Sequence, residues 1–215
     1  MLASERDLLA REACRLGCPL DEEQLDRLGT YIDLLRIWNA RIRLVGDRDP
    51  ATLVRKHVPD CLALAPMLPD EGPLADMGTG AGLPGLVLAC LRPDLECWLI
   101  EARQRPLSFL HEVKALVGLE RVRLVGSRAE TLARNRDYAG RASLVTARAV
   151  SVAALIACGL PLLRSSGCIL AMQSQKGSLD QIRRAVSVDG VRVSDAREYR
   201  LIDGETRRIV ALRRA

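Results

Sequence analysis

The most distinctive feature of the sequence is a glycine-rich run that could hold a small molecule. It reads Asp76-Met77-Gly78-Thr79-Gly80-Ala81-Gly82-Leu83-Pro84-Gly85. Glycines at alternate positions let a backbone turn sharply and approach a ligand closely, because no Cβ stands in the way. The free amides at the start of the helix expected after this run would point at the same ligand. A simple turn does not need four glycines within eight residues, so we expect a binding loop.

Two cofactors could occupy this loop. The spacing G-x-G-x-x-G that begins at Gly80 matches the dinucleotide pattern, and Glu101 follows 21 residues later, where an acid that binds the ribose belongs. However, Asp76 lies two residues before the first glycine, Gly78. Its carboxylate would repel a pyrophosphate and attract an ammonium or a sulfonium. S-adenosyl-L-methionine carries both groups and a ribose, so the sequence favours this cofactor over a nicotinamide dinucleotide.

Two further positions follow expected strands and could complete the site. Glu130, or the backbone of Ala129, could bond the edge of an adenine, although an acid is also favoured in the first turn of any helix. Arg148 would be the polar group nearest the point of methyl transfer, unless it is a solvated or ion-paired arginine. The stretch around Arg148 lacks the Asn/Asp-Pro-Pro-aromatic run often found in enzymes that methylate base amines.

The elements that position these residues alternate between strands and helices. Apolar runs predict strands at 74–78, 95–101, 122–126, 142–148 and 167–173, separated by helices at 83–91, 105–118, 129–134, 152–163 and 178–186. Such alternation indicates an α/β fold with a parallel sheet covered by helices on both faces. Residues 191–201 and 207–214 then predict a C-terminal antiparallel hairpin. Ligands of such sheets bind at the carboxyl ends of the strands, where the strand order reverses.

Four helices are expected before this sheet. Their boundaries follow from capping and proline signals, and they run from Ser4-x-x-Asp7 to Gly17, from Asp21 to Asn39, from Asp49-Pro50, and from His57 to Leu68 with Pro59 in the first turn. We therefore expect two units. Residues 1–68 form an N-terminal helical extension packed on the core, and residues 69–215 form the cofactor-binding domain.

Charge is distributed unevenly along the chain. Residues 1–102 carry 11 Lys and Arg against 17 Asp and Glu, a net charge of −6, whereas residues 103–215 carry 21 against 10, a net charge of +11. This asymmetry suggests a polyanionic partner. Neutralising Arg121, Arg123, Arg134 and Arg136 would test whether the basic half supplies the binding surface.

Other classes of protein are disfavoured by composition. The seven cysteines include no C-x-x-C and are interpreted as small buried hydrophobes of a cytoplasmic protein. With only two histidines and no paired ligand spacing, no metal site is expected. No apolar run reaches the roughly 18 residues of a membrane span, and the charged start does not read as a secretory signal.

Several motifs resemble those of the bacterial RsmG/GidB family over nearly the full length of the chain. The most specific is the glycine run with its Leu83-Pro84-Gly85 tail; the others are Trp38-Asn39, Arg48-Asp49-Pro50, His57-x-x-Asp60, Arg128-Ala129-Glu130 and Arg148-Ala149. The resemblance implies a class I methyltransferase with a Rossmann-like sheet that modifies N7 of one guanine in 16S ribosomal RNA, free or in a small-subunit particle. We expect a monomer without a metal or a membrane anchor.

The resemblance further implies which residues contact S-adenosylmethionine. These are Gly78, Leu83, Ala129, Glu130 and Arg148, together with an acid at the end of the second strand, here Glu101. Gly80, Gly82 and Asp76 join this set from the loop pattern itself. Three stretches depart from the family: Arg43-Leu44-Val45 replaces Asn-Leu-Thr/Ser, Cys61 replaces a serine, and Met172-Gln173-Ser174 replaces Leu-Lys-Gly unless a gap brings in Lys176-Gly177.

The expected chemistry needs no general base. Guanine N7 has an in-plane lone pair and is already nucleophilic, so the enzyme must mainly align N7, the methyl carbon and the sulfur, and hold the base out of its stack. Candidate catalytic groups are Arg148, Asp60 beside the base that becomes cationic, and His57 to position the base or a phosphate; His57 and Asp60 could equally pair only with each other. A nicotinamide-dependent oxidoreductase and a non-catalytic RNA-binding module remain the alternatives.

Overall fold

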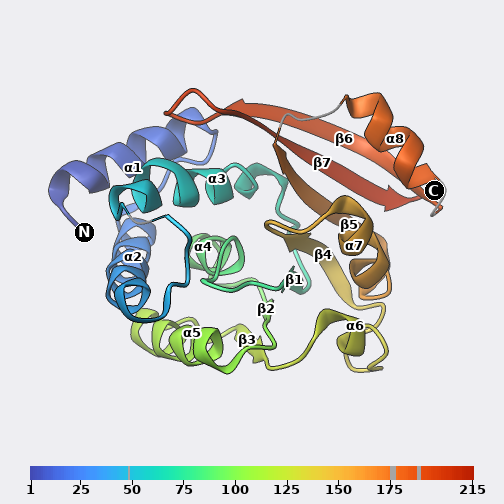
Figure 1. The fold of residues 1–215 in the computed structure, drawn as a ribbon, viewed down its shortest axis with the longest axis horizontal. Helices are drawn as coiled ribbons and strands as arrows, with labels where there is room; N and C mark the ends of the chain where they lie inside the picture. Colours follow the sequence, from blue (N-terminus) through green and yellow to red (C-terminus); the bar gives the residue numbers. More distant parts are fainter. Residues whose placement is uncertain (48, 175–177, 188–189) are drawn as a thin grey trace.

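A seven-stranded mixed sheet runs through the computed structural model, which describes residues 1–47, 49–174, 178–187 and 190–215. The strands lie in the order β3-β2-β1-β4-β5-β7-β6 (Figure 1). Their bounds are β1 (Leu74–Met77), β2 (Cys97–Ile100), β3 (Val122–Val125), β4 (Ala142–Ala147), β5 (Leu163–Ser174), β6 (Val191–Arg200) and β7 (Thr206–Arg214). Strands β1 to β5 pair in parallel, and β6 and β7 form an antiparallel hairpin that joins the sheet through β5. The predicted parallel sheet and C-terminal hairpin are confirmed.

Helices cover both faces of the sheet because its central strands are apolar on both sides. Every residue of β1, β2 and β4 is buried, a pattern found in parallel sheets that have two covered faces. One face packs against α4 (Gly85–Leu91) and α5 (Gln104–Val117). The other face packs against α6 (Ala129–Leu132), α7 (Val152–Gly159) and α8 (Leu179–Ser187). Helix α7 was predicted to reach residue 163, but it ends before Pro161, which cannot continue a helix.

The strand order reverses between β1 and β4. From β1 the sheet continues through β2 to β3 on one side, and the chain then returns to place β4 on the other side of β1. Asp76 near the end of β1 pairs in register with Thr146 of β4. The glycine loop that follows β1 and Arg148 that follows β4 therefore leave the sheet side by side, at the position where ligands of such sheets bind.

The N-terminal helices α1 (Ala3–Arg15), α2 (Glu22–Ile42) and α3 (Val58–Leu62) pack on the face that carries α4 and α5. Asp21 caps α2 as predicted: its Oδ1 accepts from the Gln24 amide at 2.7 Å, and Gln24 Oε1 accepts from the Asp21 amide at 2.9 Å. The predicted cap at Ser4 is wrong, because the N-cap of α1 is Leu2, two residues earlier, and the Leu2 amide donates to Glu5 Oε2 at 3.1 Å. Helix α2 also continues past Asn39, whose Oδ1 accepts from the Val45 amide at 2.7 Å.

The two helices predicted from Asp49-Pro50 and from His57 are one continuous helical segment. A π-helical turn at Leu53–His57 runs directly into α3, with the Val58 amide bonded to the Leu53 carbonyl. Pro59 lies inside this segment and has no amide hydrogen, so the regular ladder is interrupted there; the wider π turn precedes the interruption. The segment ends at Leu62, and a separate 3-10 turn follows at Ala65–Met67. The prediction of one helix that continues to Leu68 is therefore wrong.

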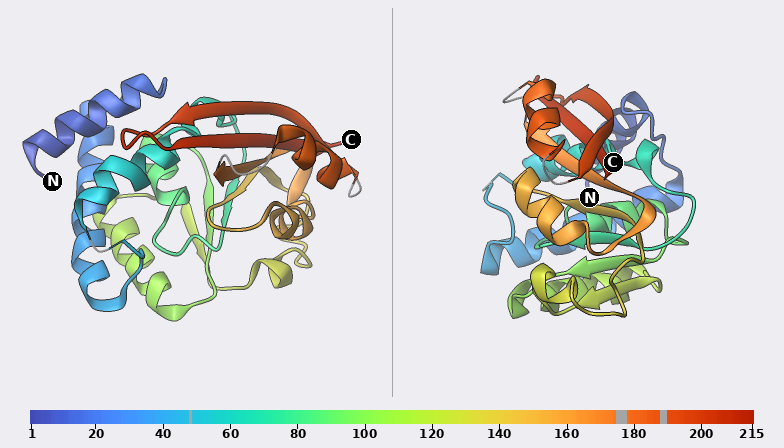
Figure 2. Two further views of the ribbon diagram at one scale, coloured as in Figure 1. Left: turned by 45° about the horizontal axis from the view of Figure 1, so that its top comes forward. Right: turned by 90° about the vertical axis from the view of Figure 1, so that its right-hand side faces the viewer.

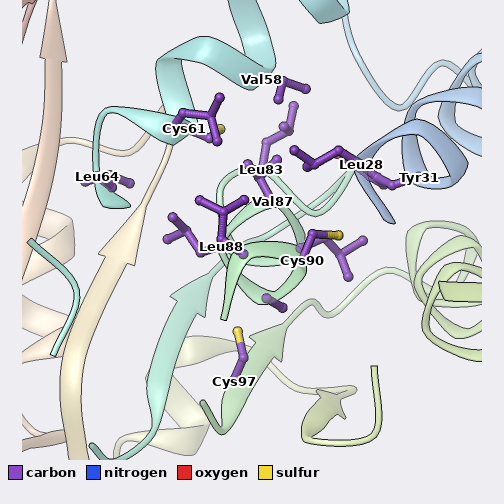
Figure 3. Packing of buried hydrophobic residues seen from close by; sticks show 14 of the residues in the cluster. Leu28, Tyr31, Val58, Cys61, Leu64, Leu83, Val87, Leu88, Cys90 and Cys97 are labelled. Carbon is purple, nitrogen blue, oxygen red and sulfur yellow. The ribbon is translucent and has the colours of Figure 1, made fainter. Parts of the chain in front are cut away.

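One apolar core joins the N-terminal helices to the sheet. Figure 3 shows Val58 and Cys61 of α3 and Tyr31 of α2 around Leu83 of the glycine loop and Val87 of α4. These side chains are buried. All seven cysteines are unpaired, and four of them, Cys61, Cys90, Cys97 and Cys168, lie in this apolar core. The ends of β1 and of its loop are therefore held by residues from outside the sheet.

The β6–β7 hairpin reaches from the sheet edge back to the N-terminal helices (Figure 2). Arg197 Nη2 donates to the Leu16 carbonyl at 2.6 Å, and Arg15 Nη2 donates to the Arg200 carbonyl at 2.5 Å. Lys56 Nζ lies 2.9 Å from Glu205 Oε2 beside the hairpin tip. Within the described ranges, no helix combines the length and the apolar character needed to cross a membrane. Arg48 and Lys176-Gly177, which the family resemblance includes, lie outside the described residues.

Gly85 should be intolerant of even one methyl group. A Cβ there would lie 2.3 Å from Leu99 Cδ2 and 2.7 Å from Asp76 Oδ2. Alanine normally stabilises a helix relative to glycine, but overpacking of this kind costs about 1–3 kcal/mol. We expect Gly85→Ala to lower the free energy of unfolding by about 2 kcal/mol in urea denaturation. Gly46→Ala is the control, because its Cβ would meet nothing within 4 Å; equal stability of the two variants would contradict this account.

Candidate active site

A pocket of about 580 Å³ opens at the carboxyl ends of β1 and β4. Its floor is the glycine loop, and its walls come from segments that are far apart in the sequence. They are the residues just after α2, the helical segment 51–62, the residues after β2 and β4, the end of β5, and the β6–β7 hairpin. The pocket therefore forms only after the N-terminal helices and the C-terminal hairpin have packed on the sheet.

The glycines of the loop divide into two groups. Gly78 (φ +66°) and Gly80 (φ +55°) line the pocket; a Cβ on Gly78 would meet nothing within 4 Å, and one on Gly80 would approach Arg103 Nη2 at 3.6 Å. No side chain of the loop stands between the backbone at these two glycines and the cavity, so a ligand can approach the backbone closely. Gly82 does not line the pocket: its Cβ would lie 2.4 Å from Leu86 Cδ1, so this glycine is required by packing within the protein. The contact of Gly82 with the cofactor stays a prediction.

Asp76 supports the loop from beneath instead of facing the cavity. The residue is fully buried, and its Oδ2 accepts from Thr79 Oγ1 at 2.6 Å and from the Gly85 amide at 2.8 Å. Burial raises the pKa of Asp76 to about 6, although the two hydrogen bonds oppose this shift. The carboxylate is enclosed by its own loop, and its contact with an ammonium or a sulfonium stays a prediction.

Glu101 follows β2 and faces the same loop. Its Oε2 accepts from the Gly80 amide at 3.1 Å and from Arg103 Nη2 at 3.1 Å, and its Oε1 accepts from the Arg103 amide at 2.8 Å and from Arg103 Nε at 3.0 Å. Burial alone would raise the pKa of Glu101, but the hydrogen bonds from Arg103 and Gly80 outweigh it and lower the pKa below its usual value. Glu101 is therefore a carboxylate beside Gly80.

Arg148 lies at the centre of a polar network on the opposite side of the pocket. Its Nε donates to Asp60 Oδ2 at 3.1 Å, and its Nη2 lies 2.8 Å from His57 Nδ1. The predicted candidates Arg148, Asp60 and His57 are thus brought together from β4 and from the helical segment 51–62. Because Asp60 is buried and Arg148 is mostly buried, each charge compensates the other away from water.

The Arg148 contact fixes the tautomer of His57. A guanidinium has only donors, so Nδ1 must accept and the ring proton of neutral His57 resides on Nε2. Nε2 lies 2.7 Å from Asp47 Oδ2, at ion-pair distance but without good hydrogen-bond geometry. Burial, and then the charge of Arg148, lower the pKa of His57 below its usual value. His57 is therefore a neutral ring held between a cation and a carboxylate.

The sequence as a whole matches an established family. A family model described as GidB, rRNA small subunit methyltransferase G, matches residues 24–210. The chain belongs to the GidB family. The Ribosomal RNA small subunit methyltransferase G of Symbiobacterium thermophilum is 37% identical over 219 residues, which cover 96% of this chain and 88% of the relative. The protein of the same name from Acetivibrio thermocellus is 31% identical over 208 residues, covering 95% and 86%.

Solved structures of low sequence identity share the fold. A methyltransferase from Geobacter sulfurreducens, described as S-adenosylmethionine-dependent and solved with S-adenosyl-L-homocysteine, has a TM-score of 0.56 at 12% identity and covers 85% of this chain and 98% of its own. One from Aquifex aeolicus has a TM-score of 0.57 at 14% identity, covering 76% and 93%. The predicted family, methyltransferase fold and cofactor are confirmed, and the oxidoreductase and non-catalytic alternatives are excluded.

Other predicted cofactor contacts of this GidB protein lie at different distances from the pocket. Leu83 lines it and is nearly buried. Ala129 and Glu130 begin α6 at the carboxyl end of β3, outside the pocket lining. Two of the three departures from the family, Leu44-Val45 and Met172-Gln173-Ser174, form pocket wall, whereas Cys61 lies in the core. The departures therefore change the surface that a substrate would meet.

Two tyrosines that complete the site were not predicted from the sequence. Tyr199 of β6 donates its hydroxyl to Asp60 Oδ1 at 2.6 Å, and Tyr31 of α2 donates to the Ala81 carbonyl of the glycine loop at 2.9 Å. Burial, and then the Asp60 carboxylate, raise the pKa of Tyr199, so its hydroxyl keeps the proton that it donates. Tyr31 lies among the buried apolar residues of α2, with the spacing of an ordinary core residue. Tyr199 stands between Glu198 and Arg200 in a strand that is mostly polar, where nothing marks it as part of a site.

Tyr199→Phe tests whether the hairpin holds Asp60. Without the hydroxyl, Asp60 Oδ1 is left buried without this donor, which costs about 1–3 kcal/mol. We expect a loss of that size in the free energy of unfolding. Tyr138→Phe should change stability by less than about 0.5 kcal/mol, because the Tyr138 hydroxyl makes no hydrogen bond to any residue that the structure describes. Similar losses in the two variants would show that the Tyr199 contact is not stabilising.

The buried Asp76 should leave a signature in the pH dependence of stability. Its pKa is raised from about 4 when unfolded to about 6 in the folded protein, so the folded state binds the proton more tightly. The contribution of Asp76 to stability is therefore greatest below pH 4 and declines as the pH rises to 6. The difference in unfolding free energy between the wild type and Asp76→Asn should shift against the wild type across this range. A difference independent of pH would contradict the raised pKa.

Proposed function

We propose that this GidB protein transfers the methyl group of S-adenosyl-L-methionine to N7 of a guanine in 16S ribosomal RNA. The observation that carries the proposal is the state of the acidic and basic groups beside Arg148. Both oxygens of Asp60 accept hydrogen bonds, from Tyr199 and from Arg148, and Nδ1 of neutral His57 faces Arg148. Among the described pocket residues of this network, none is free to remove a proton from a substrate.

This arrangement suits N7 better than an amine or a hydroxyl. N7 of guanine attacks with a lone pair and loses no proton, whereas methylation of a base amine or a ribose hydroxyl requires a proton to leave. When bound, S-adenosyl-L-methionine supplies a methyl group activated by the adjacent sulfonium. The task that remains for the protein is alignment, and a network with every member hydrogen-bonded is suited to holding groups in fixed positions.

The roles that we propose follow the geometry of the loop. The bare backbone at Gly78 and Gly80 lies against the cofactor, Leu83 packs beside it, and Glu101 accepts hydrogen bonds from the ribose hydroxyls. The cofactor adenine extends toward Ala129 and Glu130 at the end of β3. Arg148 lies beside the methionine part of the cofactor. Asp76 and Gly82 act indirectly, by fixing the shape of the loop.

His57 and Asp60 are positioning residues in this proposal. Methylation at N7 leaves the base with a positive charge, and Arg148 would oppose that charge if it stood alone. Asp60 pairs with Arg148 directly, and Asp47 lies on the far side of His57. The two carboxylates outweigh the single arginine, so the wall that the cationic product meets carries no excess positive charge.

The proposed organisation assigns a distinct task to each part of the chain. Residues 69–215 form the methyltransferase domain, and residues 1–68 form an extension that completes the pocket with Leu44, Val45, His57 and Asp60. We propose that the protein works as a monomer in the cytoplasm, where 16S rRNA is available free or in small-subunit particles. The basic residues at the pocket, Arg103, Arg148 and Arg207, are nearer to such a substrate than Arg121, which precedes β3 at the amino end of the sheet.

The direct test is to incubate the purified protein with methyl-labelled S-adenosyl-L-methionine and unmodified 16S rRNA or small subunits. We expect label in 7-methylguanosine, identified by mass spectrometry of the nucleoside digest. Gly80→Val should abolish cofactor binding in calorimetry, because a branched side chain at φ +55° is strained and points toward Arg103. Its circular dichroism spectrum should be unchanged. Label in another nucleoside, or none with either RNA substrate, would refute the proposed function.

A further inference from the structure

The carboxylate of Glu101 has no hydrogen-bonding capacity left. A carboxylate offers about four lone-pair positions, and all four are taken by one amide of the loop and three donors of Arg103: its amide, Nε and Nη2. The Glu101 side chain is only 5% exposed, so it depends on these donors to remain charged within the protein. Any new donor to Glu101 must replace one that is already there.

The donors differ in how easily they can leave. The amides of Gly80 and Arg103 belong to the backbone of the glycine loop and to the residue that precedes α5, and both are fixed by the fold. The Arg103 side chain is 71% exposed, contacts no other acid among the described residues, and lies over Gly80 at the pocket wall. Its guanidinium is thus the donor that can be displaced at least cost, since released N–H groups return directly to water.

We propose that the Arg103 side chain and the cofactor ribose compete for Glu101. This inference rests on the proposed role of Glu101 as the ribose acceptor. The guanidinium supplies two side-chain N–H donors, one to each carboxylate oxygen. The 2′- and 3′-hydroxyls of a ribose supply two O–H donors, so the exchange preserves the number of hydrogen bonds to Glu101. The Arg103 side chain therefore occupies the ribose position reversibly and lowers the affinity of the pocket for nucleosides.

The competition has a measurable consequence. Binding must first break an ion pair between a buried carboxylate and an exposed arginine, and that cost is subtracted from the affinity of any ligand with a ribose. Removing the guanidinium removes the cost. We expect Arg103→Met, which keeps an apolar stem, to bind S-adenosyl-L-homocysteine about 2- to 5-fold more tightly than the wild type. The difference should narrow at high salt, because salt already weakens the exposed ion pair.

Isothermal titration calorimetry with S-adenosyl-L-homocysteine and its 2′,3′-dideoxy analogue tests this directly. The gain should appear with the first ligand and vanish with the second, which has no hydroxyl to offer Glu101. Arg105→Met is the matched control: it removes the same charge from the start of the same helix, where Arg105 is exposed and makes no ion pair to the described residues. Its affinity should equal that of the wild type.

Thermal unfolding gives a second readout that needs no catalysis. Without ligand, Arg103→Met should unfold at a lower temperature than the wild type, because Glu101 has lost two donors. With saturating S-adenosyl-L-homocysteine the two midpoints should converge. Equal or weaker ligand affinity in Arg103→Met, or equal gains in Arg105→Met, would overturn the competition while leaving the proposed function intact. A wild type that does not bind S-adenosyl-L-homocysteine would overturn both.

Discussion

The site depends on one buried carboxylate. Asp76 is the last but one residue of the first strand, and its Oδ2 accepts hydrogen bonds from the hydroxyl of Thr79 within the loop and from the first amide of α4. Hydrogen bonds to an ionised acceptor in a low-dielectric interior are strong, so these two contacts fix where the loop turns. Gly78 and Gly80 then have their bare side toward the cavity, and Gly85 approaches Asp76 and Leu99 too closely for any other residue. The raised pKa of Asp76 is the electrostatic cost of this arrangement.

The second constraint is the mutual compensation of charges around Arg148. A largely buried arginine requires partners, and it finds them in Asp60 and His57, which belong to the N-terminal extension. Asp60 is in turn satisfied by Tyr199 from the C-terminal hairpin. Removal of any one member would leave another buried and unpaired, which is far more costly than never having formed the network. The extension, β4 and the hairpin are thus bound to one another at the pocket.

These two features give the pocket its chemical character. On one side, a fixed backbone and the Glu101 carboxylate suit a nucleoside with a flexible amino acid tail. On the other side, a network in which Arg148, Asp60, His57 and Tyr199 each take part in a hydrogen bond offers fixed charges and no free base. A nucleophile with an available lone pair needs only to be aligned with the methyl group. A nucleophile that must lose a proton also needs a general base. The Glu101 carboxylate is likewise fully hydrogen-bonded, because the Arg103 side chain supplies the donors that a ribose would otherwise provide.

Local patterns in the sequence were sufficient to predict the sheet, its hairpin, the glycine loop and the family, because each is written in residues that are close together along the chain. The joining of the third and fourth helices across Pro59 was missed, since proline usually marks a helix start. The inward positions of Asp76 and Gly82 were also missed, because the sequence shows which residues form a turn but not which of them face its interior. Tyr199 lies 139 residues from Asp60, and Arg148 lies 88 residues from it. Partners so far apart along the chain leave no periodic pattern in the sequence. Only the tertiary structure decides them, because the free energy of a buried charge depends on whatever the fold places around it.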